Sequence, residues 1–442
     1  MRGEYRRDAP DIGGYDFYGR LAPRVRNAWV VMERSRLGLG VERGAVKAQI
    51  TLQDARAFGS PSPTATFAGT RGIGRLEPYE AYLEGRSSGA RPNYFRLGRQ
   101  AVVWGEGRLV GNADFSPVGR ALDAARGHLA LGNFDFEALA AILEMPGPAG
   151  TSFGDNRGGA RSGVQLYGVL ARWTIDPLLR LEAFGLARIS RSAGDERDGS
   201  RFANARVSGE LFTGALRVSG DAKGWTYGAE GAYQLGTTSS LGIGGNDISA
   251  WAASAHVSKS LEQLLLTPTF RLAGSYASGD TGRGRYKQFD PLLADPQRFH
   301  GQMDLFAWSN MMDVAARAQI VPLTDTTVGL EWRYAKLAQA SGEWIGSYLR
   351  AIGQQTPPSL LSSSLSGPAP TSTDLGHELD LVLTWRPWLP LELRAGYSML
   401  FMGDAARTVM AMHARGRRQP DDTIAPADIA HYAYGQATLS MP

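Results

Sequence analysis

The chain has 442 residues, of which 43% are hydrophobic and 10% aromatic, and its formal net charge at pH 7 is +4. No stretch approaches the roughly 18 consecutive apolar residues of a membrane-spanning helix, which excludes a helical membrane protein. The lack of cysteine excludes disulfides, thiolate metal sites and thiol nucleophiles. The small net charge, with basic residues spread along the chain, argues against nucleic-acid binding.

Apolar and polar residues alternate with a period of two from one end of the chain to the other, which indicates β-strands. We expect an opening strand near residues 16–21 and a second over 29–41, where Leu37 and Leu39 alternate with Arg36 and Gly38. Further strands are expected over residues 46–53, 79–84, 94–104, 119–131, 134–140, 164–175, 179–188, 205–219, 225–234, 248–259, 267–278, 313–319, 328–333, 378–385, 391–398 and around 432–434.

Short and long connections alternate along the chain. Short turns are expected near residues 42–44, 87–92, 132–133, 176–177, 221–224, 322–325 and 386–390. Long loops are expected over residues 57–75, 105–119, 146–162, 192–201, 279–306, 340–374 and up to about 428. Outer-membrane barrels have short periplasmic turns and long extracellular loops, whereas a soluble sandwich has no reason to sort its loops in this way. A soluble β architecture such as a propeller is the alternative, although no repeat of 40 to 50 residues with a blade signature occurs.

The pattern therefore predicts an all-β fold, a single transmembrane antiparallel β-barrel of about 18 strands that occupies residues 1–442 in the bacterial outer membrane. Trp225, Trp251, Trp385 and Trp388 lie near strand ends, as in aromatic girdles. No apolar signal segment follows Met1. We therefore expect a mature chain with an added initiator Met, and a periplasmic N-terminal segment over residues 1–14.

The segment over residues 94–126 carries a resemblance to a known family. It contains LGRQ at 97–100, GEGRLVGN at 105–112 and VGRALDAAR at 118–126. With several further segments, these make the chain resemble the alginate-export family of outer-membrane porins. The further segments are TLQDARAFG at 51–59, EAYLE at 80–84, SYASGD at 275–280, FDPL at 289–292, MDLFAWSNMMD at 303–313 and GHELDLVLTWRP at 376–387. The resemblance implies an eighteen-stranded barrel and, in the members that export alginate, an arginine-lined conduit for an anionic polysaccharide.

Residues opposite the apolar face are expected to line a water-filled lumen. Only five of the 47 basic residues are lysines, and guanidinium groups bind carboxylates in a fixed geometry. For any one arginine, the alternative is that it only pairs with a neighbouring carboxylate and narrows the bore. The candidate lumen and substrate-binding residues are Arg36, Arg96, Arg99, Arg126, Arg180, Arg188, Arg271, Arg317, Arg333, Arg394, Glu80, Glu84, Glu230, Glu378 and Asp380.

Arg99 does not follow the scheme, because strict alternation from Phe95 and Leu97 points it at lipid. An arginine at mid-depth of the lipid face costs about 2 to 4 kcal/mol. We therefore predict a bulge near Gly98 that turns Arg99 inward. The loop over residues 105–119 is expected to shape the outer mouth of the barrel.

Three functions compete at this point: an export conduit for an alginate-like anionic polysaccharide, a diffusion porin for small anionic or aromatic solutes, and a barrel-embedded enzyme. The six histidines are scattered and no HExxH or GxSxG motif occurs, so we expect no catalytic residues, no cofactor and no metal site. The expected partners are outer-membrane lipid, the anionic polysaccharide or solute, and periplasmic secretion components, with the barrel itself a monomer.

Overall fold

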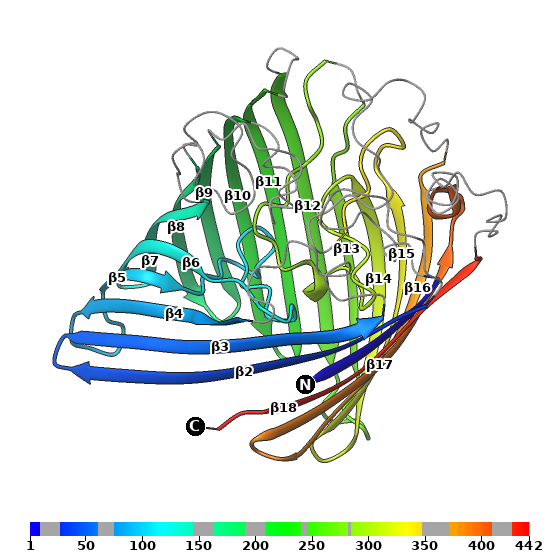
Figure 1. Cartoon of the computed structure of the whole chain (residues 1–442), viewed down its shortest axis with the longest axis horizontal. Coiled ribbons are helices and arrows are strands. Elements are labelled where there is room, and N and C mark those ends of the chain that lie inside the picture. Colours follow the sequence, from blue (N-terminus) through cyan, green and yellow to red (C-terminus); the bar gives the residue numbers. More distant parts are fainter. Residues whose placement is uncertain are drawn as a thin grey trace.

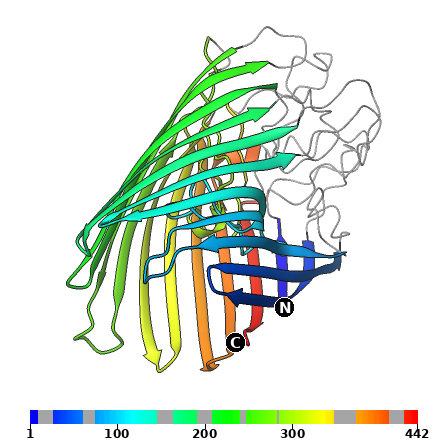
Figure 2. The same ribbon diagram turned by 90° about the vertical axis from the view of Figure 1, so that its left-hand side faces the viewer.

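The computed structural model describes residues 1–8, 27–60, 75–144, 163–190, 208–239, 246–281, 284–346, 372–408 and 427–441. These residues form one 18-stranded antiparallel sheet that closes on itself (Figures 1 and 2). In this part of the chain, no helix has the length and apolar character needed to cross a membrane. The predicted fold, an eighteen-stranded antiparallel barrel, is confirmed.

The strand bounds follow the alternating segments of the sequence, because each strand presents one apolar and one polar face. The strands are β1 Arg2–Arg7, β2 Asn27–Arg43, β3 Val46–Ser60, β4 Arg75–Arg86, β5 Tyr94–Gln100, β6 Leu122–Leu131, β7 Phe134–Glu144, β8 Val164–Asp176, β9 Leu179–Ser190, β10 Ser208–Ala222, β11 Trp225–Ser239, β12 Asn246–Ser260, β13 Thr269–Ala277, β14 Met311–Leu323, β15 Thr326–Leu337, β16 Asp374–Trp388, β17 Leu391–Met402 and β18 Ile429–Leu439.

The first strand closes the barrel. Each strand from β2 to β18 pairs with its neighbours in sequence, and β1 pairs with both β2 and β18. The Met1 amino group donates a hydrogen bond to the carbonyl oxygen of Ala437 at 2.8 Å, so both ends of the chain lie at the short-turn end of the barrel (Figure 1).

The expected periplasmic segment over residues 1–14 is therefore wrong for Arg2–Arg7, which is a barrel strand. The sequence does not reveal this strand because Arg2, Glu4 and Arg6 are charged residues that face the interior, while Tyr5 is the one large apolar residue on the outer face. The opening strand expected near residues 16–21 lies outside the described residues.

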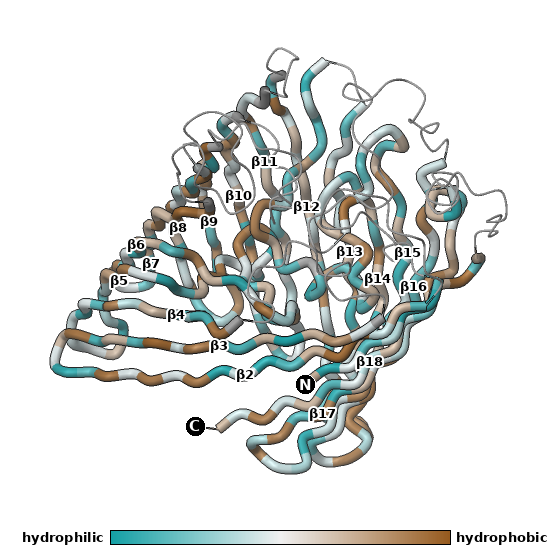
Figure 3. The backbone as a smooth tube through the Cα atoms, viewed as in Figure 1, coloured by the Kyte–Doolittle hydropathy of each residue, from teal (hydrophilic) through white to brown (hydrophobic). Residues whose placement is uncertain are grey.

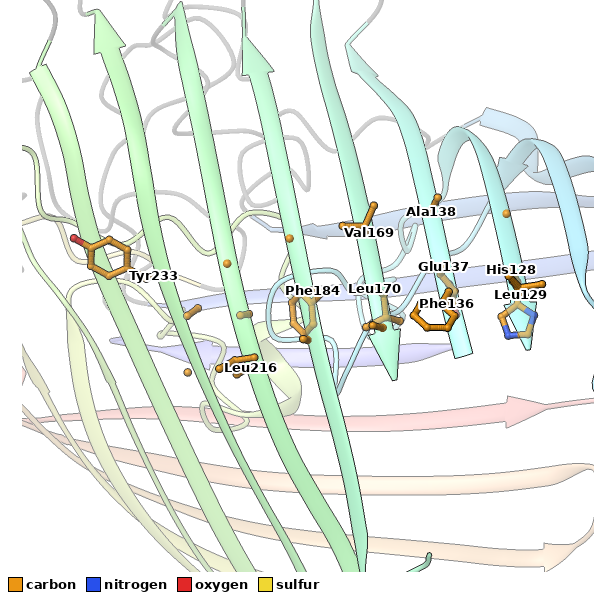
Figure 4. A pocket seen from close by; sticks show the side chains of 18 of the residues that line it. His128, Leu129, Phe136, Glu137, Ala138, Val169, Leu170, Phe184, Leu216 and Tyr233 are labelled. Carbon is orange, nitrogen blue, oxygen red and sulfur yellow. The ribbon is translucent and has the colours of Figure 1, made fainter. Parts of the chain in front are cut away.

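Hydrophobic and hydrophilic residues alternate along the strands (Figure 3), and the burial of their side chains alternates between the two faces of the wall, as the sequence predicts. On β2, Leu37, Leu39 and Val41 are 76%, 67% and 62% exposed on the outer face. Trp225, Trp251, Trp385 and Trp388 are also exposed there. The outer wall over β6–β12 contains a shallow apolar hollow lined by glycine, alanine and larger residues such as Val169, Leu216 and Tyr233 (Figure 4).

Two long connections fold back into the barrel instead of projecting from its mouth (Figure 1). We call residues 101–121, between β5 and β6, the first inner loop, and the described residues of 278–310, between β13 and β14, the second inner loop. Trp104, Leu109, Phe289 and Trp308 in these loops are at most 1% exposed. The expectation that residues 105–119 shape the outer mouth is thus wrong.

Candidate functional site

The two inner loops touch each other along a short parallel bridge between Val110 and Leu293. Backbone hydrogen bonds on either side join Gly111 N to Leu293 O at 2.8 Å and Asp295 N to Gly107 O at 2.9 Å. A Cβ atom on Gly111 would lie 2.9 Å from Asp295 Cβ. The glycines of the 105–111 segment therefore permit the close approach of the two backbones.

Arg120 fastens this contact from one side. Its Nη1 donates to the carbonyl oxygens of Gly111 and Ala294, both at 3.0 Å, and also to that of Leu293. Burial lowers the pKa of Arg120 to about 10. A charged guanidinium that donates to several buried carbonyls makes strong hydrogen bonds, so Arg120 holds the two inner loops together.

The first inner loop is tied to the wall by ionic contacts. Trp104 Nε1 donates to Glu137 Oε2 on β7 at 3.1 Å, and Arg126 Nη2 on β6 donates to the same oxygen at 2.6 Å. Glu106 Oε1 lies 2.9 Å from Arg217 Nη2 and 3.7 Å from His256 Nε2. Burial opposes ionisation of Glu106, but the Arg217 hydrogen bond and the charges of His256 and Arg108 outweigh it and hold its pKa below the usual value.

The opposite side of the first inner loop meets β2. Asp114 Oδ1 accepts a hydrogen bond from Arg36 Nη1 at 2.9 Å and lies 3.2 Å from Arg34 Nη1. The Arg36 guanidinium stacks on the ring of Tyr79 at 3.6 Å from its centroid. The loop therefore bridges the lumen from β2 to β10–β12.

The second inner loop is held by the wall in a similar way. Asp290 pairs with Arg188 at 2.6 Å. Glu378 Oε1 accepts from the backbone N–H of Met303 at 3.0 Å, and Asp380 Oδ2 from that of Gln302 at 3.3 Å. These two carboxylates, expected as lumen sites for substrate, thus face the lumen but position the loop.

The candidate arginines fall into three groups. Arg36, Arg96, Arg126, Arg188 and Arg333 each pair with a carboxylate: Asp114, Glu84, Glu137, Asp290 and Asp313. The second group comprises Arg180, Arg271, Arg317 and Arg394, which have no carboxylate oxygen within 4 Å among the residues that the structure describes. The third group is Arg99 alone.

Arg99 lies on the outer face, so the prediction that it turns inward is wrong. β5 keeps a continuous register with both neighbours, and Arg99 is opposite Asp123, with 3.1 Å between Nη1 and Oδ2. Gly98 has a φ of +124°, but the register shift lies in the neighbouring β4, next to Glu80. Arg99 is one residue from the end of β5, and the carboxylate of Asp123 offsets its charge on the outer face.

The remaining candidate acids also face the lumen. Glu80 Oε1 accepts from the backbone N–H of Ala101 at the start of the first inner loop, at 3.1 Å. Glu84 pairs with Arg96 as described above. Glu230 is 5% exposed beneath the first inner loop, and neither of its carboxylate oxygens has a hydrogen-bond partner among the described residues.

The unpaired arginines of the second group lie near the same end of the barrel. Arg180, Arg271 and Arg394 are within the first four residues of β9, β13 and β17, directly after turns at the short-turn end. Arg317 on β14 is opposite Arg271. The lumen is therefore charge-paired at the inner loops and carries unpaired guanidinium groups between those loops and the short turns.

Sequence reasoning missed the loop residues that narrow the lumen: Trp104, Glu106, Arg108, Asp114, Arg120, Asp290 and Gln302. It also missed Arg34, Arg172 and Arg217 on the wall. One signal was present, because the apolar clusters at 109–110, 292–293 and 305–308 are unusual in exposed loops and indicate segments packed against something. Across the described ranges, no three His, Asp or Glu side chains gather as a metal site would require.

Comparisons with known proteins agree with this geometry. The crystal structure of Pseudomonas aeruginosa OccD3 (OpdP) superposes with a TM-score of 0.52 at 11% identity, covering 99% of this chain and 90% of that one. Pseudomonas aeruginosa OccK11 (OpdR) gives a TM-score of 0.51 at 12% identity, with 100% and 94% covered. These likenesses concern the fold. No curated protein matches the chain.

The family comparison covers most of the chain. The model of the family described as alginate export matches residues 20–142 and 186–418. The matched ranges include the first inner loop, the second inner loop and most of the strands that carry the unpaired arginines. The chain is an outer-membrane β-barrel channel and belongs to the alginate export family.

Proposed function

We propose that this channel passes an anionic, uronate-type polysaccharide outward, and that the polysaccharide first meets the lumen at the short-turn, periplasmic end. The observation that carries the proposal is the position of the unpaired arginines Arg180, Arg271, Arg317 and Arg394, all between the inner loops and that end. Each guanidinium is free to bind a carboxylate from the lumen.

The pairing pattern supports passage in preference to trapping. Conduction requires sites that are favourable enough to enter and weak enough to leave. At the inner loops the charges of Arg36, Arg126, Arg188 and Arg217 are offset by carboxylates 2.6 to 2.9 Å away. A polyanion attracted by the unpaired arginines would therefore next reach the constriction at the inner loops. The positive and negative charges nearly cancel there, so the polyanion would not bind tightly.

A second candidate is a diffusion channel for small anionic solutes, and the inner loops favour it. Trp104 and Trp308 are each 1% exposed and take up lumen space that an open conduit would leave to water. The two candidates differ in how binding to the lumen arginines depends on the length of the anion. A polymer contacts several arginines at once and binds more tightly by multivalency, whereas a small anion contacts one or two.

Single-channel recordings in planar bilayers separate these candidates. Oligouronates of increasing length are added to one side, and neutral oligosaccharides of equal length serve as the control. We expect block of the ion current to strengthen with oligouronate length and to be stronger from the short-turn side. Block that is independent of length would favour the small-solute channel, and equal block by charged and neutral oligosaccharides would contradict both.

A further inference from the structure

A second apolar hollow lies on the outer wall over β12–β15 and has a volume of about 440 Å³. Its floor is formed by two alanines of β14, Ala316 and Ala318. The strands on either side place larger apolar residues directly opposite these alanines: Leu272 and Phe270 of β13, and Trp332 and Leu330 of β15. The hollow therefore exists because two small side chains stand between strands that carry large ones. We call it the β14 hollow.

The β14 hollow runs from the short-turn end of the barrel toward its middle. Antiparallel pairing aligns one row across the four strands as Lys259, Phe270, Ala318 and Leu330, and the next row as Val257, Leu272, Ala316 and Trp332. The Lys259 row is nearer the turn, since β12 ends at Ser260. Rows on one face of a sheet are two residues, or about 7 Å, apart. The end of the hollow at the short turns is therefore cationic, and the rest is apolar.

Lys259 supplies the positive charge at that end. Its Nζ donates to the carbonyl oxygen of Lys223 at 2.7 Å and lies 5.1 Å from the centre of the Trp225 ring. An ammonium group has three donors, so two remain for another acceptor. Among the residues that the structure describes, neither Lys259 nor Lys223 forms an ion pair. Two ammonium groups without a carboxylate thus stand beside an apolar hollow.

This combination of charge and shape matches a phospholipid. Tryptophan and lysine side chains near the ends of membrane-spanning segments lie at the boundary between lipid and water, and basic residues there attract anionic lipid headgroups. An acyl chain that runs from such a headgroup toward the middle of the membrane follows the direction of the β14 hollow. A second barrel packed over the hollow would instead enclose Lys259 without a counter-charge, which is costly.

We propose that the β14 hollow binds one anionic phospholipid. Lys259 and Lys223 bind its phosphate, and one acyl chain packs over Ala316 and Ala318, where it restores the dispersion contacts that an unfilled hollow lacks. Because the site is on the outer wall, it does not depend on which solute passes through the lumen.

Native mass spectrometry of the purified chain in nonionic detergent tests the site. The barrel is titrated with dipalmitoyl phosphatidylglycerol, and the retained lipid molecules are counted. Dipalmitoylglycerol, which has the chains without the phosphate, and glycerophosphoglycerol, which has the headgroup without the chains, serve as control probes. The variants are Lys259→Gln, Lys223→Gln/Lys259→Gln and Ala316→Leu/Ala318→Leu, which fills the hollow. Lys336→Gln is the matched control, because it removes one lysine at the other end of β15.

We expect the unaltered barrel to retain one phosphatidylglycerol molecule and to bind both control probes more weakly. Affinity should fall about fivefold in Lys259→Gln and about 30-fold in the double lysine variant. It should also fall in the double alanine variant and stay unchanged in Lys336→Gln. Equal affinity in all variants would overturn the proposal. So would glycerophosphoglycerol that binds as tightly as the lipid, or barrel dimers that form as the lipid is lost, since the latter would place a second copy over the hollow.

Discussion

Arg271 and Arg317 lie directly opposite each other on β13 and β14, with both side chains facing the lumen. Among the described residues neither has a carboxylate within 4 Å, although Arg317 Nη2 donates to Gln319 Oε1 at 3.0 Å. Two like charges side by side repel unless an anion lies between them or water screens them. This pair is therefore where the account predicts that the channel first binds a carboxylate.

Neutralising this pair should weaken anion preference. A unit charge about 4 Å from a passing ion contributes about 1 kcal/mol in water-like surroundings. The Arg271→Gln/Arg317→Gln variant removes two such charges and should lose up to about 30-fold in the chloride-to-potassium permeability ratio, with about fivefold expected for either single variant. Reversal potentials in a salt gradient measure this ratio.

The matched control removes a lumen arginine together with its partner. Arg96 pairs with Glu84 at 2.6 Å, and the Arg96→Gln/Glu84→Gln variant leaves the net charge of the lumen unchanged. Its permeability ratio should stay at the value of the unaltered channel. A loss as large as that of the Arg271 and Arg317 variant would show that charge pairing does not distinguish the two sets of arginines.

Replacing Arg120 should loosen the inner loops from each other. The Arg120→Met variant leaves buried carbonyl oxygens without their charged donor, which costs the loop contact about 2 to 3 kcal/mol. Hydrogen exchange at residues 107–111 and 291–295 should then be faster by about 30- to 160-fold, while strand amides keep their rates. Arg120→Lys should recover part of the loss because it retains the charge but not the forked geometry. Unchanged exchange in Arg120→Met would contradict the role assigned to Arg120.

The attachment of the first inner loop should depend on pH in one direction. The pKa of Glu106 is below its usual value of 4.5, because Arg217 and the neighbouring positive charges favour the carboxylate over the burial that opposes it. The stabilisation that the Glu106 carboxylate provides is therefore complete at pH values above the usual glutamate pKa. It is lost as the pH falls through the lowered pKa that Glu106 has in the folded protein. We expect loop-dependent current noise to appear only below pH 4.5.

In Glu106→Gln the same noise should be present at neutral pH, because the neutral amide cannot form an ion pair with Arg217. Glu392→Gln provides the comparison, since Glu392 pairs with Arg386 at the short-turn end, far from the inner loops in sequence and structure. Current noise that increases as the pH rises would be the opposite of the expected pH dependence and would contradict this explanation.

The outer pair Arg99 and Asp123 should contribute little to folding. Exposed ion pairs are worth about 0.2 to 1 kcal/mol, and charges near the membrane boundary cost about 0 to 1 kcal/mol. The Arg99→Leu/Asp123→Leu variant should therefore unfold in urea from lipid vesicles within about 1 kcal/mol of the unaltered barrel. Asp123→Leu alone should be the least stable of the set. A large gain in the double variant would place the pair deep in the lipid layer.

The sequence predicted the wall well because strand alternation and turn length are local properties. The hairpins around Gly44, Gly132 and Gly224 follow directly from short-range pattern. The path of the inner loops is different, since it depends on contacts such as Glu106 with Arg217 and Asp290 with Arg188, which join residues about a hundred positions apart and leave no periodic signal.

The error at Arg99 has a physical cause as well. An unpaired arginine at mid-depth of the lipid layer is costly, but the sequence pattern does not reveal that β5 ends at Gln100 or that Asp123 is opposite Arg99. The N-terminal strand was missed because its interior positions are Arg2, Glu4 and Arg6, which resemble a solvated tail when seen without β2 and β18.

The central claim is that unpaired arginines make this lumen a path for anions. The most direct test is the reversal potential of the unaltered channel across a tenfold potassium chloride gradient at neutral pH. The account predicts a reversal potential with the sign of a chloride-selective channel. This potential should fall toward zero when oligouronate is added at the short-turn side. A potential set by potassium, unaffected by oligouronate, would contradict it.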